Sequence, residues 1–405
     1  MSRCDQLKSN KETILIGEIG GLLHDIGKVH PSFIKLHARD CGDTGLPHHA
    51  RGIDDILSSR LINYLKNDRL KVKLGKADEK SVYDFIREHH PERDKEVKSV
   101  LLEYLMSCDR KDSADDKGIV RRKQSIKNTV ISSPFGSPKE VINLDSLQKR
   151  FDELDNQLGD MVERYINHGM DLIELRNAIR DFLKSAFSHA LGETRIPAND
   201  VTLWDHSFST ASLFKSTLAG KMLGEEPKGT CRFFGINWNG WEFIKRGRKI
   251  ADIQKRSEII EEIKSELRKK FEDDFPIGNA LYEDINGIYF SFPGLDLSEA
   301  KKLAEECAQK VLEEKIIDKK SDHELWPFFT LSRASGSLTI IAGELKFAAQ
   351  KRKVPRMTPV LFVEGSEEHF FENPPLEASV AGQDICPTCR LRPKDEGGGR
   401  FECSV

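Results

Sequence analysis

The spacing of apolar residues changes once along this chain of 405 residues, at about Gly229. Before that point apolar residues recur at intervals of three and four, as in Ile19, Leu22 and Ile26, which is typical of amphipathic helices. After it, short apolar runs typical of strands alternate with charged amphipathic helices. The sequence therefore predicts an α+β protein with a mostly helical N-terminal part.

The helical part is predicted to form one domain over residues 1–220. Helical periodicity covers residues 1–110, resumes over 147–191 and predicts a last helix over 200–219. Residues 112–143 break the pattern, because they are polar and contain two prolines, and we interpret them as an inserted loop.

The part after Gly229 has the predicted element order βαββαβ, which is that of a ferredoxin-like domain. The strongest signal is Asn286-Gly287 between two apolar runs, which indicates a hairpin. The domain is predicted over 229–345, and the proline-containing residues 346–385 are predicted to be a linker. The predicted elements are a strand at 231–238, a helix at 245–272, strands at 279–282 and 288–292, a helix at 298–316, and strands at 328–332 and 337–341.

Composition excludes several classes of protein. The 63 Lys and Arg against 66 Asp and Glu argue against a uniformly basic nucleic-acid binder. The 22 Phe and 38% hydrophobic residues exclude a disordered chain. No run reaches the ~18–20 apolar residues of a membrane helix, and the first residues lack the apolar core of a signal peptide. With eight scattered Cys, we expect a cytoplasmic protein with no membrane partner.

Ten of the twelve histidines lie before residue 210, and the most informative run is Leu22-Leu23-His24-Asp25-Ile26-Gly27-Lys28. His24 and Asp25 follow a strongly apolar half-turn, and imidazole with carboxylate suits a divalent transition metal. Adjacent helical residues point about 100° apart, so further ligands must come from other segments. The candidates are His48, His49, His89, His90, Asp109 and His206.

His-Asp-Ile-Gly-Lys, followed by His-His and a later Asp, resembles the HD phosphohydrolase superfamily, whose members hydrolyse phosphoesters with one or two bound metals. Ordinary HD proteins carry an isolated His before the His-Asp pair, and no plausible one lies upstream here. His206, in Asp-His-Ser-Phe-Ser, resembles that first helix displaced to the end of the domain. The resemblance therefore implies a circularly permuted HD domain.

A permuted HD domain, the run Pro-Ala-Asn-Asp-Val-Thr-Leu-Trp-Asp-His-Ser (197–207), a ferredoxin-like block and a terminal Cys-x-x-Cys together resemble the large subunit of type III CRISPR effector complexes. The resemblance covers essentially the whole chain. It implies antiviral defence, an HD domain that cuts single-stranded DNA, and two palm domains, the second of which makes cyclic oligoadenylates from ATP. The implied partners are other subunits, the guide RNA and, indirectly, the target RNA.

The resemblance also implies roles for individual residues. His24, Asp25 and Lys28 are expected to be catalytic, with Lys28 stabilising the developing phosphoryl charge. The expected ligands of Mn, Co or Ni are His24 and Asp25, His89 or His90, Asp109 and His206, with His48 and His49 as weaker matches between which we cannot choose.

The block at 229–345 resembles the first palm domain, but Gly-Gly-Asp-Asp appears nowhere in the sequence. At the equivalent hairpin stand Glu283 and Asp284, which we interpret as polar residues beside a tight turn rather than remnants of a metal site. Cyclase activity, and ATP with it, is expected only from a second palm absent from these 405 residues. We therefore expect the chain to be the N-terminal portion of a longer protein.

Cys386, Cys389 and Cys403 indicate an incomplete zinc ribbon over 386–405, with a fourth ligand expected beyond Val405. A redox Cys-x-x-Cys is the alternative, but Pro387 favours a loop over the start of a helix.

Two other functions stay open. One is a stand-alone HD-type nucleotide phosphohydrolase, which would keep the metal site but act on nucleotides. The other is a non-catalytic scaffold subunit, whose HD and palm folds only hold the complex together.

Overall fold

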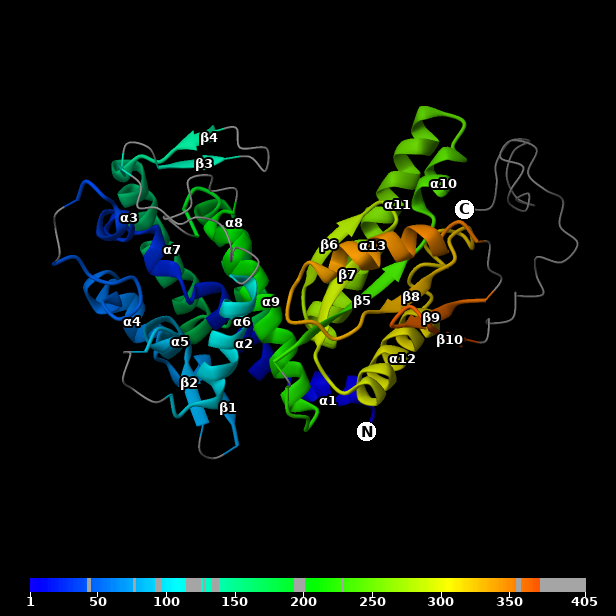
Figure 1. Cartoon of the computed structure of the whole chain (residues 1–405), viewed down its shortest axis with the longest axis horizontal. Coiled ribbons are helices and arrows are strands. Elements are labelled where there is room, and N and C mark those ends of the chain that lie inside the picture. The colour runs from blue at the N-terminus through cyan, green and yellow to red at the C-terminus, as the bar shows by residue number, and fades with distance from the viewer. Residues whose placement is uncertain are drawn as a thin grey trace, which may run out of the picture.

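The computed structural model describes residues 1–41, 45–75, 78–91, 97–113, 125–126, 129–132, 138–192, 201–227, 229–354 and 358–371. It consists of a helical part up to Met222 and a part built on a six-stranded sheet from Cys231 onward (Figure 1). Residues 386–405, with Cys386, Cys389 and Cys403 of the predicted zinc ribbon, lie outside the described residues. So do residues 114–124, 127–128 and 133–137 of the predicted loop.

This part is mostly helical, as predicted, and it also contains two short antiparallel hairpins. Its helices are α1 (Arg3–Ser9), α2 (Lys11–Leu23), α3 (Pro31–His37), α4 (Ser59–Leu65), α5 (Val82–Glu88), α6 (Val100–Asp112), α7 (Leu144–Asn167), α8 (Leu172–Phe187) and α9 (Leu203–Met222). Its strands are β1 (Lys71–Leu74), β2 (Asp78–Ser81), β3 (Val130–Ser132) and β4 (Pro138–Val141).

Helix α2 is the centre of this part and packs against α5, α8 and α9. Its apolar residues face several neighbours at once, and every residue from Ile14 to Leu23 is buried. Gly21 allows a close approach, because a Cβ there would lie 2.8 Å from the Cα of Ala211 in α9. The C-terminal end of α2 is thereby held in the interior of the helical part.

The predicted helical stretch 147–191 is two helices rather than one. It breaks after Asn167, where Gly169 adopts a positive φ of 77°, and α8 restarts with Asp171 as its N-cap. The last predicted helix corresponds to α9, and its start is fixed by a capping box between Thr202 and Asp205.

From β5 to β8 the sheet part has the element order βααββαβ, in which two helices, α10 and α11, follow β5 where one was predicted. The sheet order is β10-β9-β8-β5-β7-β6, in which β8 and β9 are parallel and the other neighbours antiparallel. The hairpin predicted at Asn286-Gly287 is present between β6 and β7. The strands are β5 (Cys231–Asn237), β6 (Ala280–Asp284), β7 (Gly287–Pro293), β8 (Phe328–Leu331), β9 (Val360–Val363) and β10 (Glu367–Phe370). The helices are α10 (Gly240–Lys245), α11 (Ile250–Arg268), α12 (Leu297–Glu313) and α13 (Ile340–Lys351).

Two predictions for this part were wrong. The strand expected at 337–341 is instead the approach to helix α13, because Leu338, Ile341 and Leu345 have helical spacing and pack on a buried aromatic cluster of the sheet. The linker expected at 346–385 contains the end of α13 and the hairpin β9–β10. All four residues of β9 are buried, because it extends the sheet beside β8.

The two parts share one hydrophobic core, which runs from α2 through α9 into β5 and β7. A buried network of charges also joins them. Lys215 of α9 donates hydrogen bonds to Glu18 (2.7 Å), to the Glu272 carbonyl (2.8 Å) and to Asn279 (2.8 Å). Arg176 of α8 contacts Glu18 and Glu272, both at 3.5 Å. These contacts fix the position of α2 and α9 relative to the sheet.

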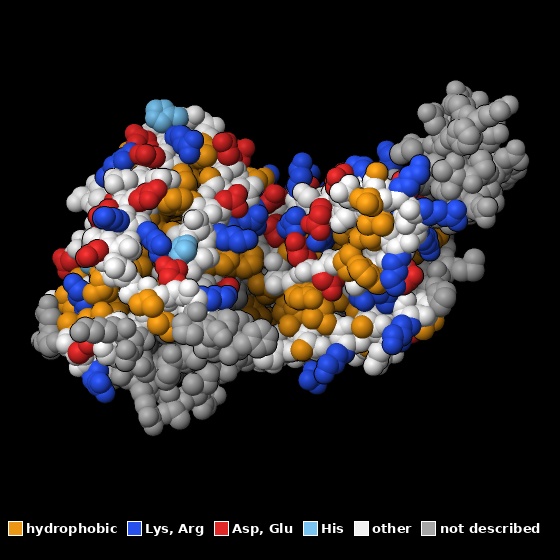
Figure 2. Space-filling model, turned by 90° about the horizontal axis from the view of Figure 1, so that it is seen from above, with side chains coloured by type: hydrophobic (Ala, Val, Ile, Leu, Met, Phe, Trp, Pro, Cys, Tyr) orange, Lys and Arg blue, Asp and Glu red, His pale blue; other side chains and the backbone are white. Residues whose placement is uncertain are grey.

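The exposed surface carries both signs of charge. Lys and Arg side chains are interspersed with Asp and Glu on the face in Figure 2, which agrees with the net charge of −3. Among the described residues, no helix has the length and hydropathy needed to cross a membrane.

Candidate metal centre

Asp25 lies directly after α2 and is 1% exposed, with imidazole rings on both sides of its carboxylate. Its Oδ1 is 3.2 Å from Nε2 of His89 and 3.3 Å from Nε2 of His49. Its Oδ2 is 3.2 Å from Nε2 of His206 and 3.3 Å from Nε2 of His24. One carboxylate therefore faces four ring nitrogens.

The surrounding side chains come from segments that are distant in the sequence. His24 and Asp25 follow α2, His49 lies between α3 and α4, and the pair His89-His90 follows α5. Asp109 lies in the last turn of α6, and His206 lies in the first turn of α9. The apolar periodicity of these helices, rather than local sequence, brings the polar residues together.

The potential ligands form two groups, and within each group the ligand atoms lie within 4.8 Å of one another. Asp109 adds a second carboxylate, with its Oδ1 3.3 Å from Nε2 of His206. Because the two oxygens of Asp25 face different groups, Asp25 is suited to be shared between them. The first group is Asp25, His49, His89 and His90, and the second is His24, Asp109 and His206.

His48 belongs to neither group, although it is adjacent to His49. Its ring stacks on that of His49, with centroids 4.2 Å apart, and its Nδ1 accepts a hydrogen bond from the backbone N–H of Ala50 at 3.1 Å. The structure thus distinguishes two histidines that the sequence left equivalent.

The donor set fits a divalent transition metal. Nδ1 of His24 contacts the Gly21 carbonyl at 2.7 Å, and Nδ1 of His89 contacts the Ile86 carbonyl at 2.9 Å. A carbonyl only accepts, so each Nδ1 carries the proton and each Nε2 presents a lone pair. Among the described residues, Nε2 of His24, His49 and His206 is buried and has no hydrogen-bond partner. A metal ion would satisfy these nitrogens.

The electrostatics at Asp25, His49 and His90 favour metal ligation. Burial raises the pKa of Asp25, but the charge of Lys28 is the main cause that opposes burial, and the pKa is held well below its usual range. The carboxylate is therefore charged at neutral pH. Burial lowers the pKa of His49 and of His90 to about 3, so both rings are neutral and able to bind a metal.

Lys28 lies at the edge of this cluster. Its Nζ is 2.6 Å from Oδ2 of Asp25 and donates a hydrogen bond to the Gly192 carbonyl at 3.1 Å. The short turn Ile26–Val29 that presents it packs tightly against the backbone of His49. A Cβ on Gly27 would lie 2.1 Å from the His49 carbonyl oxygen, so this approach requires glycine.

Sequence reasoning missed Asp112. This residue lies one helical turn after Asp109, and its Oδ2 is 2.6 Å from Nδ1 of His206. The i, i+3 spacing of the two aspartates on α6 was the available signal, because it places both on one face of the helix.

The carboxylates at the β6–β7 hairpin do not resemble those of the His/Asp cluster. Asp284 accepts a hydrogen bond from the backbone N–H of Asn286 at 2.7 Å, and Glu283 forms an ion pair with Arg268. Within the described residues, neither carboxylate belongs to a group of potential metal ligands. Asp284 stabilises the turn, and Glu283 takes part in an ion pair with Arg268.

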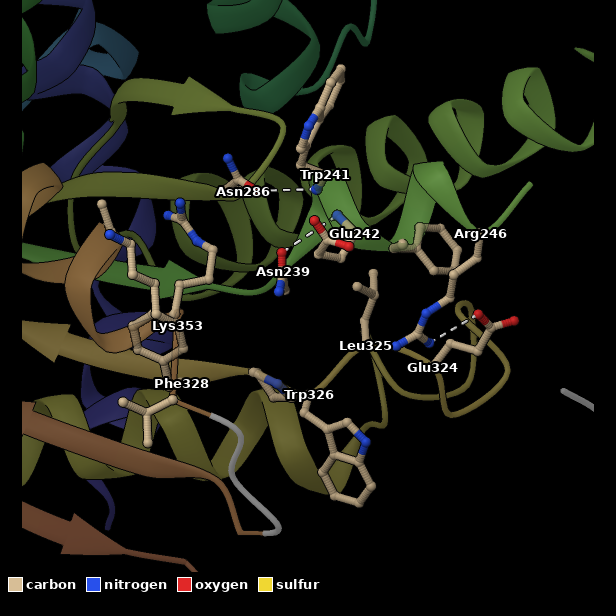
Figure 3. Close-up of a pocket in the computed structure, with 15 residues that line it drawn as sticks. Asn239, Trp241, Glu242, Arg246, Asn286, Glu324, Leu325, Trp326, Phe328 and Lys353 are labelled. Atoms are coloured by element: carbon tan, nitrogen blue, oxygen red, sulfur yellow. Dashed lines mark hydrogen bonds and ion pairs between the residues drawn. The ribbon is translucent and has the colours of Figure 1, made fainter. Parts of the chain in front are cut away.

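A cavity of about 760 Å³ opens beside this hairpin (Figure 3). Trp241, 53% exposed, and Trp326, 42% exposed, line it together with Arg246, Arg352 and Lys353. It offers aromatic rings and basic groups but none of the His/Asp ligand groups found among the described residues. Of these two places, the cluster around Asp25 is the one that offers groups of potential metal ligands.

The sequence matches no protein-family model and no curated protein. The fold, however, matches solved structures of Csm1, the large subunit of type III CRISPR complexes. The Csm1–Csm4 cassette in complex with cA4 has a TM-score of 0.56 at 16% identity, over 84% of this chain and 48% of that chain. The apo cassette has a TM-score of 0.55 at 17% identity, over 84% and 48%. Csm1 of T. onnurineus has a TM-score of 0.51 at 16% identity, over 86% and 50%.

The chain thus has an α+β fold similar to that of Csm1. At 16–17% sequence identity, the likeness shows the fold alone. The chain spans about half the length of the solved chains that it matches.

Proposed function

We propose that this protein acts as the large subunit of a type III CRISPR effector complex and cleaves single-stranded DNA at a permuted HD-type metal centre. The observation that carries the proposal is the buried Asp25 with four imidazole nitrogens within 3.3 Å of its carboxylate oxygens. The fold shared with Csm1 supports the assignment to an antiviral effector complex.

In this proposal the two ligand groups hold one or two ions of Mn²⁺, Co²⁺ or Ni²⁺. A bound divalent ion lowers the pKa of water and withdraws charge from phosphoryl oxygens. Asp25, whose anion is stabilised by Lys28, would link the two groups. The Nδ1–H bonds of His24 and His89 to backbone carbonyls hold their rings in place.

Lys28 has a separate role in this proposal. Its ammonium is at the edge of the cluster and only partly exposed, where it can meet a phosphodiester that approaches from solvent. It would stabilise the charge that develops on the phosphoryl oxygens.

We also propose the domain assignment. Residues 1–220 would form the HD domain and the sheet part a first palm domain, which would include β9 and β10. Cys386, Cys389 and Cys403 remain candidates for structural zinc. Cyclic oligoadenylate synthesis from ATP would need a palm with Gly-Gly-Asp-Asp, a motif that this sequence does not contain. The matched cassettes pair Csm1 with Csm4, so we infer cytoplasmic assembly with other subunits and the guide RNA.

The direct test is cleavage of end-labelled single-stranded DNA by the purified protein with Mn²⁺, Co²⁺ or Ni²⁺. The parent should cut, and a His24→Ala/Asp25→Ala variant should fall to the metal-free background. Asp160→Ala is the matched control, because Asp160 is an exposed carboxylate paired with Arg60 on the surface. Cleavage by the double variant at the parental rate would refute the site.

The two alternatives give other outcomes in the same experiment. Release of phosphate from deoxynucleoside triphosphates without DNA cleavage would select the nucleotide phosphohydrolase. Elemental analysis that finds no transition metal after incubation with each ion would select the non-catalytic scaffold.

A further inference from the structure

Asp112 belongs to neither ligand group, yet both of its carboxylate oxygens are engaged at the metal centre. Oδ2 accepts a hydrogen bond from Nδ1 of His206 at 2.6 Å, and Oδ1 accepts one from the Ser209 hydroxyl. Ser209 lies one turn after His206 on α9, so it holds the carboxylate beside the ring. Asp112 is therefore fixed in place by the same helix that carries the histidine.

The partner of His206 differs in kind from those of the neighbouring rings. His24 and His89 donate from Nδ1 to backbone carbonyls of their own helices. His206 instead uses a carboxylate from α6, a helix that precedes it by almost one hundred residues. Charge-assisted hydrogen bonds are stronger than neutral ones, and a carboxylate partner makes an imidazole a better ligand.

Helix α6 contacts both edges of the same ring. Oδ1 of Asp109 is 3.3 Å from Nε2, the edge that faces the candidate ion position, whereas Asp112 contacts Nδ1, the opposite edge. The two aspartates, one helical turn apart, can therefore have different roles. Asp109 can ligate, and Asp112 can orient the ring.

We propose that Asp112, held by Ser209, is a positioning residue of the metal centre that keeps the proton of His206 on Nδ1 and its Nε2 lone pair directed at the ion. The inference rests on the metal centre of the proposed function. It adds a residue that does not itself touch the ion.

The first test is Co²⁺ binding, measured by isothermal titration on the full chain. Loss of an outer hydrogen-bond partner typically weakens metal affinity roughly 10- to 100-fold. We expect Asp112→Ala to do so without changing the number of ions bound, and Asp112→Asn to have a smaller effect, because an amide oxygen still accepts. Asp109→Ala should lower the number of ions, and Asp160→Ala should match the parent.

The second test isolates the hydrogen bond itself. In Zn²⁺-loaded protein labelled with ¹⁵N-histidine, the Nδ1 proton of His206 should exchange slowly with solvent. Asp112→Ala should abolish that signal and leave those of His24 and His89 unchanged. A general loss of folding would remove all three signals, and circular dichroism would identify it.

Two results would overturn the inference. Parental Co²⁺ affinity in Asp112→Ala would show that the carboxylate does not position His206, and a reduced number of ions would make Asp112 a ligand. Failure of the proposed function looks different. If the parent binds Co²⁺ and Asp112→Ala weakens that binding, but the parent never cuts DNA, the positioning role of Asp112 stands and the proposed nuclease activity fails.

Discussion

Two adjacent histidines with the same side chain have opposite environments. His49 is buried and its Nε2 faces Asp25 at 3.3 Å, whereas His48 stacks on it and bonds the backbone at Ala50. The difference comes from the turn Ile26–Val29, which packs on the backbone at His49 through Gly27. Tertiary contacts, and not residue type, decide which of the two histidines joins a group of potential ligands.

We expect His49→Ala to lower the number of Co²⁺ ions bound, because it removes one member of a ligand group. His48→Ala is the matched control and should bind the parental number, since His48 belongs to neither group. Dialysis against Co²⁺ followed by elemental analysis measures both. Equal losses in the two variants would contradict this assignment.

Helices α2 and α9 must pack closely, because candidate ligands lie on or beside both and their backbones meet at Gly21 and Ala211. A side chain at Gly21 would press on the backbone of α9 rather than on a flexible side chain. Such overpacking cannot be relieved without moving one of the helices.

We therefore expect Gly21→Val to destabilise the protein by about 1–3 kcal/mol, as overpacked cores do. Gly343→Ala in α13 is the control, because a Cβ there meets nothing within 4 Å, and it should be neutral or slightly stabilising. Urea unfolding of the three proteins measures the difference. A Gly21→Val variant as stable as the parent would show that α2 and α9 can move apart without loss of stability.

The elements also show what sequence can predict. The hairpin at Asn286-Gly287 and the helix at His206 follow from local signals, a turn dipeptide and apolar residues at helical spacing, and both are present. The strand expected at 337–341 fails because a short apolar run fits either a strand or the first turn of a helix. Only packing against the aromatic cluster of the sheet decides for α13.

The same limit applies to the site. The chemistry of His24 and Asp25 identified the centre, and the candidate ligands do gather around it with the exception of His48. The spacing from Asp109 could have placed Asp112 on the same face of α6, but its contact with His206 depends on how α6 and α9 pack. The division into two groups depends on helix packing in the same way.

At the scale of the whole molecule, the buried charges around Glu18 join the helical part to the sheet. Glu18 contacts Lys215, Arg176 and Asn279, and none of these side chains reaches solvent. A buried ion pair whose partner is removed costs about 3–5 kcal/mol, so this network ties the two parts together only while its charges are intact.

This network predicts loss of stability in acid. Burial raises the pKa of Glu18, but Arg176 and Lys215 lower it to about 2, below its ordinary 4.5. Between these values the unfolded chain binds the proton and the folded chain does not, so stability falls as the pH falls through that window. The loss attributable to Glu18 should be on the order of 3 kcal/mol.

Urea unfolding between pH 7 and pH 2.5 tests this prediction against Glu18→Gln. The variant should be less stable at pH 7 and should lose less stability on acidification, because its side chain does not titrate. Parallel pH profiles for the two proteins would assign the acid sensitivity to other carboxylates.

The separation of His24 and Asp25 from His206 along the chain also has a consequence for biosynthesis. The ribosome makes the first two candidate ligands early and His206 only after six more of the described α-helices, α3 to α8, have been made. An ion that meets the nascent chain finds a partial set of ligands, and α9 must dock beside α2 to complete it. Whatever chemistry the centre performs, a newly made molecule acquires it late in synthesis, once its helical part has folded around α2.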